Sequence, residues 1–220
     1  MEQKDRNQKE EKKGIPGMDL ILASGSPRRR ELLSGIGLTY EVIPSTVEEK
    51  VTVSRPEEVV LSLAEQKAAE VCERLRTSGR EGFLVLGADT IVALGEEIMG
   101  KPGDEAEACR MLSSLQGGRH QVYTGVAFCI PETDGIRTYS FYEKTEVEMY
   151  PMTAEEIRDY VAGGEPMDKA GAYAIQGGCA AYIKGIHGDY TNVVGLPVGR
   201  VWQEMKKRSW ENTDPSDSPV

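Results

Sequence analysis

The feature that most constrains the fold is a continuous apolar run at residues 83–88, which is followed at once by Asp89 and Thr90. An apolar run of this length is typical of a strand that is buried on both faces of a sheet. We predict that the strand ends at Asp89, the kind of position where open α/β sheets place their chemistry. An Asp at a strand end can also be a simple turn former, so the carboxylate by itself leaves both interpretations open.

The other segments predict a chain in which helices and strands first alternate and strands then pair. We expect strands at residues 20–23, 40–44, 91–94, 120–130, 138–150 and 180–186, and helices at residues 27–36, 55–75, 104–115, 153–161 and 193–207, the last of which is interrupted by Leu196-Pro197. Asp104 and Thr153 are the expected helix N-caps, and a turn at Asp134 and Gly135 joins an antiparallel pair of strands. This order predicts an α/β protein with a mixed, twisted central sheet flanked by helices.

Chain length and charge limit the organisation of the protein. A chain of 220 residues is long enough for one domain or two small lobes. We assign one domain to residues 18–208 and expect disordered tails at 1–17 and 209–220, because these ends are charged and poor in apolar side chains. The formal net charge of −10 argues against nonspecific binding to nucleic acid. The sequence contains neither a transmembrane run nor a signal peptide, so we expect a cytoplasmic protein without membrane contact.

A second polar motif follows the first predicted strand. Ser24-Gly25-Ser26-Pro27 precedes three consecutive arginines that begin with Arg28 and Arg29. A Ser before Pro is typical of a helix N-cap with Pro at the first helical position. Arginines are normally disfavoured at this positive end of a helix, so their presence indicates a bound anion such as phosphate. The alternative is a capped helix whose arginines are merely solvated.

Two further segments could contribute to a phosphate site. Residues 95–102 nearly match a P-loop, but Pro102 stands where the magnesium-binding hydroxyl should be, so the match fails. Lys101 then is either a phosphate contact or a solvated hairpin lysine. Residues 165–178 are rich in Gly and Ala, which suits either close approach to a ligand or a tight connection. Glu48 and Glu49 are first of all surface charges, although a second carboxylate near Asp89 would suit a metal that bridges phosphates.

Taken together, these motifs resemble the Maf family of nucleoside triphosphate pyrophosphatases over about residues 20–207. The matching segments are Leu22-Ala23-Ser24-Gly25-Ser26-Pro27-Arg28-Arg29, Gly87-Ala88-Asp89-Thr90, Gly100-Lys101-Pro102, Asp168-Lys169-Ala170-Gly171-Ala172-Tyr173 and Ile175-Gln176-Gly177. The resemblance implies a Maf/ITPase-like fold with a cleft between two lobes, a homodimer, and cleavage of a nucleoside triphosphate to the monophosphate and pyrophosphate. Thr90 is similar to the branch that acts on dTTP and UTP, a specificity that could extend to modified pyrimidine nucleotides.

The same resemblance suggests roles for individual residues. Asp89 is expected to accept a proton from the attacking water, and we further assign Asp89 and Glu48 to a divalent cation, Mg²⁺ or Mn²⁺. The expected substrate-binding residues are Ser24, Ser26, Arg28, Arg29, Thr90, Lys101, Lys169 and Gln176, of which Arg28, Thr90 and Gln176 are carried over as selecting a pyrimidine base. Phosphoanhydride cleavage depends mainly on positioning and on neutralising charge, for which arginine and lysine are suited.

Other functional classes remain open at this point. A nucleotide-binding regulator of cell division would bind the same ligand with slow or incidental hydrolysis. A P-loop ATPase would release orthophosphate, but Pro102 counts against it. Two histidines and four widely spaced cysteines argue against a Ser-His-Asp triad and against structural zinc.

Overall fold

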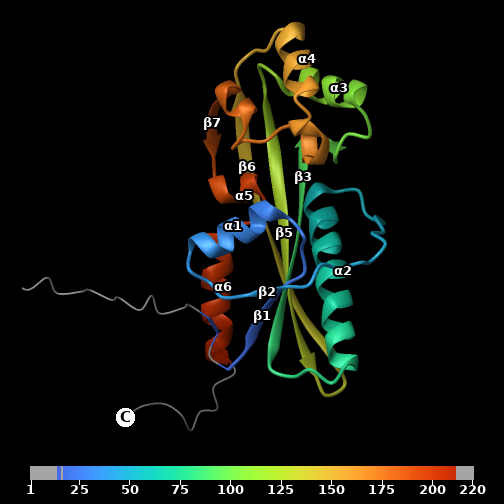
Figure 1. The fold of residues 1–220 in the computed structure, drawn as a ribbon, viewed down its shortest axis with the longest axis vertical. Coiled ribbons are helices and arrows are strands. Elements are labelled where there is room, and N and C mark those ends of the chain that lie inside the picture. Colours follow the sequence, from blue (N-terminus) through green and yellow to red (C-terminus); the bar gives the residue numbers. More distant parts are fainter. Residues whose placement is uncertain (1–13, 16, 212–220) are drawn as a thin grey trace, which may run out of the picture.

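The structure is a computed structural model that describes residues 14–15 and 17–211 (Figure 1). Most of the two predicted tails lies outside these residues. The backbone of the last helix, α6 (Val198–Glu211), continues three residues beyond the predicted domain boundary at residue 208. Within the described residues, no helix combines the length and the apolar character of a membrane span.

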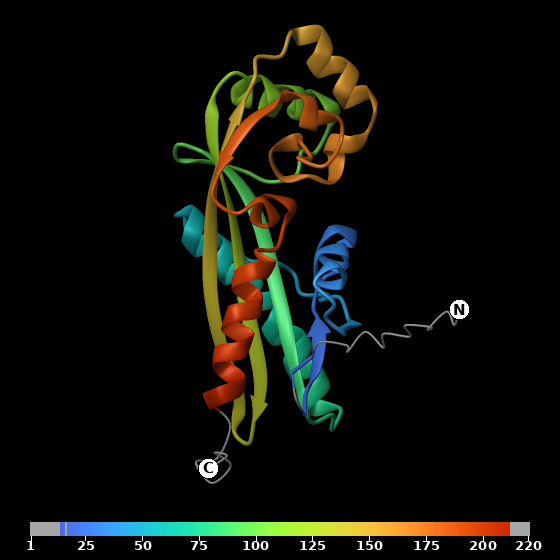
Figure 2. The same cartoon turned by 90° about the vertical axis from the view of Figure 1, so that its left-hand side faces the viewer.

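A seven-stranded mixed sheet forms the centre of the molecule, as the sequence predicts. The strands are β1 (Asp19–Leu22), β2 (Glu41–Val42), β3 (Phe83–Leu94), β4 (Glu97–Met99), β5 (Arg119–Glu132), β6 (Gly135–Met149) and β7 (Ile183–His187). Their order is β2-β1-β3-β5-β6-β7, with β4 paired to β3. Strand β1 runs parallel to β2 and β3, whereas all the other pairs are antiparallel. The long strands β3, β5 and β6 run side by side along the long axis of the molecule (Figure 2).

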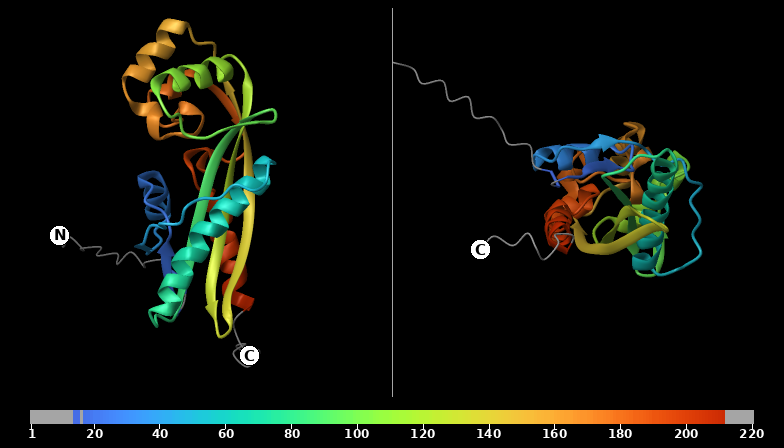
Figure 3. Two further views of the ribbon diagram at one scale, coloured as in Figure 1. Left: turned by 90° about the vertical axis from the view of Figure 1, so that its right-hand side faces the viewer. Right: turned by 90° about the horizontal axis from the view of Figure 1, so that it is seen from below.

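Helices cover this sheet in two groups along the long strands (Figure 3). The helices are α1 (Pro27–Gly35), α2 (Pro56–Thr77), α3 (Glu105–Leu115), α4 (Ala154–Ala162), α5 (Tyr190–Val194) and α6, with short 3₁₀ helices η1 (Glu165–Asp168), η2 (Ala170–Ala172) and η3 (Gly178–Tyr182). Helices α3 and α4 share one apolar core with the 3₁₀ segments. Helices α1 and α6 pack on a second core, and α2 packs on a third. The core of α3 and α4 forms one lobe, and the cores of α1, α6 and α2 form the other. This agrees with the predicted two-lobe arrangement.

Local sequence signals account for most of these elements. Asp104 caps α3 by accepting a hydrogen bond from the backbone N–H of Glu107 at 2.7 Å. Thr153 and Glu156 form the expected capping box at the start of α4. Ser26 occupies the N-cap position of α1, but its side chain makes no capping hydrogen bond, which corrects that detail of the prediction. Instead, the backbone N–H of Ser26 bonds to the hydroxyl of Ser24 at 3.3 Å.

Two strand predictions are wrong. The apolar strand does not end at Asp89: β3 continues to Leu94 as one strand, since its ladder with β5 runs without interruption through Asp89 opposite Gly125. Residues 180–182, expected to begin the strand at 180–186, belong instead to η3, and β7 starts only at Ile183. In both cases the partner strand decides the outcome, because pairing with a distant segment is not visible in a local apolar pattern.

Helix α2 lies unusually close to the sheet at two glycines. A Cβ atom at Gly87 of β3 would stand 2.5 Å from the carbonyl oxygen of Ala64, and one at Gly125 of β5 would stand 2.1 Å from that of Val60. Only residues without a side chain permit this approach. The close packing brings the middle of α2 next to Asp89, so these glycines help to build the site described below.

Candidate active site

A cavity of about 680 Å³ lies between the two groups of helices. Its lining includes Asp89 and every predicted substrate-binding residue, namely Ser24, Ser26, Arg28, Arg29, Thr90, Lys101, Lys169 and Gln176. Glu48 is exposed and is not part of the lining, whereas the neighbouring Glu49 is. Side chains that are far apart in the sequence thus meet in one place, and four of them, Arg28, Arg29, Lys101 and Lys169, carry positive charge.

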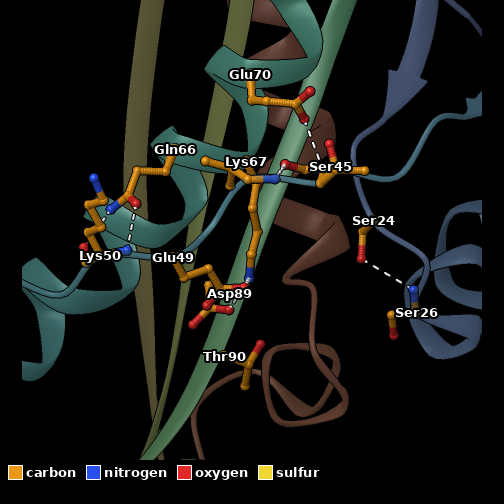
Figure 4. Close-up of polar contacts among 12 residues, drawn as sticks. Ser24, Ser26, Ser45, Glu49, Lys50, Gln66, Lys67, Glu70, Asp89 and Thr90 are labelled. Carbon is orange, nitrogen blue, oxygen red and sulfur yellow. Dashed lines mark hydrogen bonds and ion pairs between the residues drawn. The ribbon is translucent and has the colours of Figure 1, made fainter.

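Asp89 is paired with a lysine that the sequence analysis did not select. The Nζ atom of Lys67 lies 2.5 Å from Oδ1 of Asp89 and 3.0 Å from Oε1 of Glu49. Figure 4 shows the side chain of Lys67 reaching from α2 toward Asp89 on β3. Both Lys67 and Asp89 are largely buried, with side chains 15% and 14% exposed. Lys67 stands four residues from each of two buried apolar residues, Leu63 and Val71, and a lysine inside an apolar helical stripe is a signal that could have identified it.

The arrangement around Lys67 allows a test of the expected metal. Two carboxylates, Asp89 and Glu49, already share one cationic group, so the space between them favours positive charge. Within the described part of the chain, no three Asp, Glu, His or Cys side chains gather into a metal-binding group. Mg²⁺ commonly takes one or two protein carboxylates and completes its shell with phosphate oxygens and water. Asp89 and Glu49 therefore fit a cation that arrives with a phosphate, whereas Glu48, the expected second ligand, lies outside the cavity lining.

Arg29 joins three parts of the site through its whole guanidinium group. Its Nε donates to the carbonyl of Gly195 at 2.8 Å, Nη1 to the hydroxyl of Ser24 at 3.1 Å, and Nη2 to the hydroxyl of Thr90 at 3.1 Å. Burial lowers the pKa of Arg29, and the negative charge of Asp89 opposes this effect. An arginine remains protonated despite such a shift. Arg29 is thus a fixed positive charge that also holds the walls of the cavity together.

Thr90 belongs to the same buried network. Its hydroxyl lies 2.9 Å from that of Thr124, which in turn donates to the carbonyl of Asn192 at 3.0 Å. The sequence analysis selected neither Thr124 nor Asn192, and both are fully buried. The hydroxyl of Thr90 is therefore engaged by protein groups, and it influences the cavity through Arg29.

Arg28 is more accessible than Arg29 and faces the opposite lobe. Its side chain is 29% exposed and lies 3.4 Å from the carboxylate of Asp168. Burial alone would raise the pKa of Asp168, but its hydrogen bond and ion pair with Lys169, reinforced by Arg28, lower it overall. Arg28, Lys101 and Lys169 then remain as cationic groups at the rim and walls of the cavity that can meet a polyanion.

Behind the cavity wall, His120 supports Tyr173. Nε2 of His120 lies 2.8 Å from the hydroxyl of Tyr173, a cavity-lining residue, and the imidazole is fully buried. Burial lowers the pKa of His120 to about 4. The unfolded chain, with a histidine pKa of about 6.5, therefore binds a proton at a higher pH than the folded protein does.

We expect this histidine to make the protein less stable as the pH falls from about 6.5 toward 4. Between pH 7 and pH 4.5 the free energy of unfolding should fall by about 2–3 kcal/mol because of His120 alone. Urea unfolding at both pH values should show this loss in wild type and a correspondingly smaller loss in His120→Gln. The exposed His187→Gln is the matched control and should behave like wild type. An unchanged pH dependence in His120→Gln would contradict the prediction.

The fold is a curled mixed sheet flanked by helices, and its cavity is lined by the carboxylates of Asp89, Glu49 and Asp168 together with several cationic side chains. This defines an α/β protein whose cavity has the charge to suit an anionic ligand. The chain belongs to the Maf family, since residues 19–208 match the family described as Maf-like protein. This membership confirms the resemblance noted in the sequence.

Named relatives are similar over nearly their whole length. A dTTP/UTP pyrophosphatase of Agathobacter rectalis is 52% identical over 198 residues, which cover 86% of this chain and 96% of the relative. A dTTP/UTP pyrophosphatase of Bacillus thuringiensis subsp. konkukian is 49% identical over 189 residues, covering 86% of this chain and 94% of the relative. Among solved structures, the Staphylococcus aureus Ham1 protein matches 60% of this chain and 71% of its own with a TM-score of 0.39 and 16% identity, which is too little to bear on function.

Proposed function

We propose that this protein hydrolyses dTTP and UTP between the α- and β-phosphates and releases the nucleoside monophosphate and pyrophosphate. Relatives at about 50% identity carry the name of this activity. The observation that carries the proposal is the meeting of Asp89, Arg28, Lys101 and Lys169 in one cavity. A carboxylate surrounded by cationic groups is what hydrolysis of a triphosphate requires, because charge on the phosphates must be neutralised while water attacks.

In this proposal the cationic side chains bind and orient the triphosphate. Arg28, Lys101 and Lys169 approach it from different walls of the cavity, and the hydroxyls of Ser24 and Ser26 lie at the N-terminus of α1. Backbone N–H groups at a helix N-terminus favour an anion, which adds to the effect of the side chains. Arg29 contributes a fixed charge and ties α1 to Gly195 and to Thr90 of β3 through its hydrogen bonds.

Asp89 is the proposed proton acceptor for the attacking water. Lys67 contacts its Oδ1 atom, so we assign Oδ2 to the proton. A divalent cation, Mg²⁺ or Mn²⁺, would be held by Asp89 and Glu49 and would supply further neutralisation of the phosphate charge. Lys67 holds the two carboxylates in place through its ion pairs with both, and its ammonium group offsets their mutual repulsion.

Base selection is assigned to Arg28, Thr90 and Gln176. Gln176 lies on an exposed turn at the cavity rim, where an amide can pair with the polar edge of a pyrimidine. Thr90 contributes through the network that holds Arg29.

We further propose a single domain over residues 18–208, a homodimer, a cytoplasmic location and no binding of nucleic acid. The proposed dimer can be tested by light scattering.

A substrate panel tests the proposed reaction. The purified protein is mixed with dTTP, UTP, CTP, GTP and ATP in Mg²⁺ or Mn²⁺, and pyrophosphate and orthophosphate are measured separately. We expect pyrophosphate from dTTP and UTP, at a kcat/KM at least about 10-fold above that for the purine nucleotides. Release of orthophosphate would point to an ATPase instead. Tight binding without turnover would favour the nucleotide-binding regulator.

A further inference from the structure

The turn that carries Gln176 is tied at both ends to one pair of side chains. Tyr160 of α4 donates its hydroxyl proton to Oε1 of Glu165 at 2.7 Å and accepts a hydrogen bond from the backbone N–H of Ala174 at 3.1 Å. Oε2 of Glu165 accepts a hydrogen bond from the backbone N–H of Gly178 at 3.0 Å. Ala174 and Gly178 flank Gln176 on its two sides, so the Tyr160–Glu165 pair closes the turn.

Packing beneath the turn adds a steric restraint. A Cβ atom at Gly177 would stand 2.0 Å from Oε1 of Glu165, so the carboxylate lies directly against the backbone next to Gln176. Ile175, on the other side of Gln176, is buried, while Gln176 itself is exposed. Burial, reinforced by the bond to Glu165, raises the pKa of Tyr160, and its hydroxyl therefore stays a donor across the working pH range.

The neighbouring part of this segment, which carries Lys169 and contacts the turn at Lys101, is held by different contacts. The backbone N–H of Gly171 donates to the carbonyl of Gly100 at 3.0 Å, next to Lys101. The backbone N–H of Lys169 bonds to the carbonyl of Pro166 at 3.0 Å. The ammonium group of Lys169 also donates to the backbone carbonyl of Glu165 at 3.3 Å, a contact that a change of the Glu165 side chain leaves in place. Lys101 and Lys169 are thus positioned by backbone groups, whereas the turn around Gln176 is positioned by the side chains of Tyr160 and Glu165.

We propose that Tyr160 and Glu165 are positioning residues for base recognition, which act through Gln176 without touching the nucleotide. Neither side chain lines the cavity that the described residues form. The inference rests on the proposed function, because it takes Gln176 as a contact to the base. Its physical content is that an exposed amide discriminates between bases only when its backbone is held in place, and this pair provides the hold.

The experiment measures equilibrium binding of two probes by calorimetry, dTMP, which carries the base, and tripolyphosphate, which does not. Tyr160→Phe removes the bonds to Glu165 and Ala174, and Glu165→Gln replaces one acceptor oxygen with a donor. We expect each variant to bind dTMP roughly 10-fold more weakly and tripolyphosphate as wild type does. In steady-state assays the KM for dTTP should rise with little change in kcat. The matched control, Thr153→Ala, loosens the opposite end of α4 and should leave the ratio of the two affinities unchanged.

A double variant shows whether the effect passes through Gln176. In a Gln176→Ala background, Tyr160→Phe should cause no further loss of dTMP binding, because the group that it positions is gone. Additive losses in the double variant would overturn the proposal. So would an equal weakening of dTMP and tripolyphosphate binding in the single variants. A change in the ratio of the two affinities in Thr153→Ala, as large as that in Tyr160→Phe, would overturn it as well. Since binding is measured without turnover, failure of the proposed hydrolysis would appear separately, as a wild-type protein that binds dTMP and releases no pyrophosphate.

Discussion

Asp89→Asn is expected to lower kcat for dTTP hydrolysis by about 10³-fold while the protein still folds and binds the nucleotide. The amide is nearly the same size as the carboxylate, so the cavity keeps its shape. It cannot accept the proton of the attacking water, and it weakens the assigned site for a divalent cation. Pyrophosphate release at saturating Mg²⁺ or Mn²⁺ measures the loss, and calorimetric titration with dTTP shows that binding persists.

Two flanking variants serve as comparison for this result. Glu49→Gln should raise the metal concentration needed for half-maximal activity, because Glu49 reaches the Lys67–Asp89 pair. Glu48→Gln should not, since Glu48 lies outside the cavity lining. Near-normal turnover by Asp89→Asn at saturating metal would remove Asp89 from the role of proton acceptor. If Glu48→Gln and not Glu49→Gln raised the required metal concentration, Glu48 would be the second metal ligand, as the sequence predicts.

Gly125→Ala is expected to destabilise the folded protein by about 3 kcal/mol, near the upper end for added atoms in a packed core. The new methyl group would overlap the backbone of α2, with the carbonyl oxygen of Val60 at 2.1 Å and its carbon at 2.3 Å. A helix backbone cannot yield as a flexible side chain does, so α2 must shift away from β5. Urea unfolding should report the loss directly.

The same variant should also impair catalysis, because the helix that moves carries Lys67. Displacement of α2 separates Lys67 from Asp89 and Glu49, which it now contacts at 2.5 Å and 3.0 Å. The matched control is Gly185→Ala on β7, where an added methyl group meets no atom within 4 Å. This control should leave stability and activity nearly unchanged. The prediction fails if Gly125→Ala and Gly185→Ala have similar free energies of unfolding.

Much of the fold was accessible from local sequence patterns. The long helix α2, the cap at Asp104, the capping box at Thr153 and the hairpin at Gly135 all lie where the sequence indicates. Each of these signals depends on residues within a few positions of one another, and such short-range preferences act in any tertiary context.

The features that local sequence patterns did not reveal depend on distant segments. Strand β3 passes through Asp89 because β5 pairs with it on both sides of that residue. Glu49, and not its neighbour Glu48, forms an ion pair with Lys67. Which of the two faces α2 depends on how the irregular segment that carries them packs against this helix. Arg29 appears in the sequence as one of three equivalent arginines, but only the structure shows that its donors are engaged by Gly195, Ser24 and Thr90.

The sequence by itself determined which chemical groups the protein has available and on which elements they lie: a carboxylate after an apolar run, arginines at a helix start, and lysines and an amide in glycine-rich turns. Only the tertiary structure decided which of these groups meet, which are bound to protein and which stay free for a ligand. The physical reason is that these meetings depend on the packing of α2 against two glycines of the sheet and on the register of the strands. Both depend on residues that are far apart in the chain.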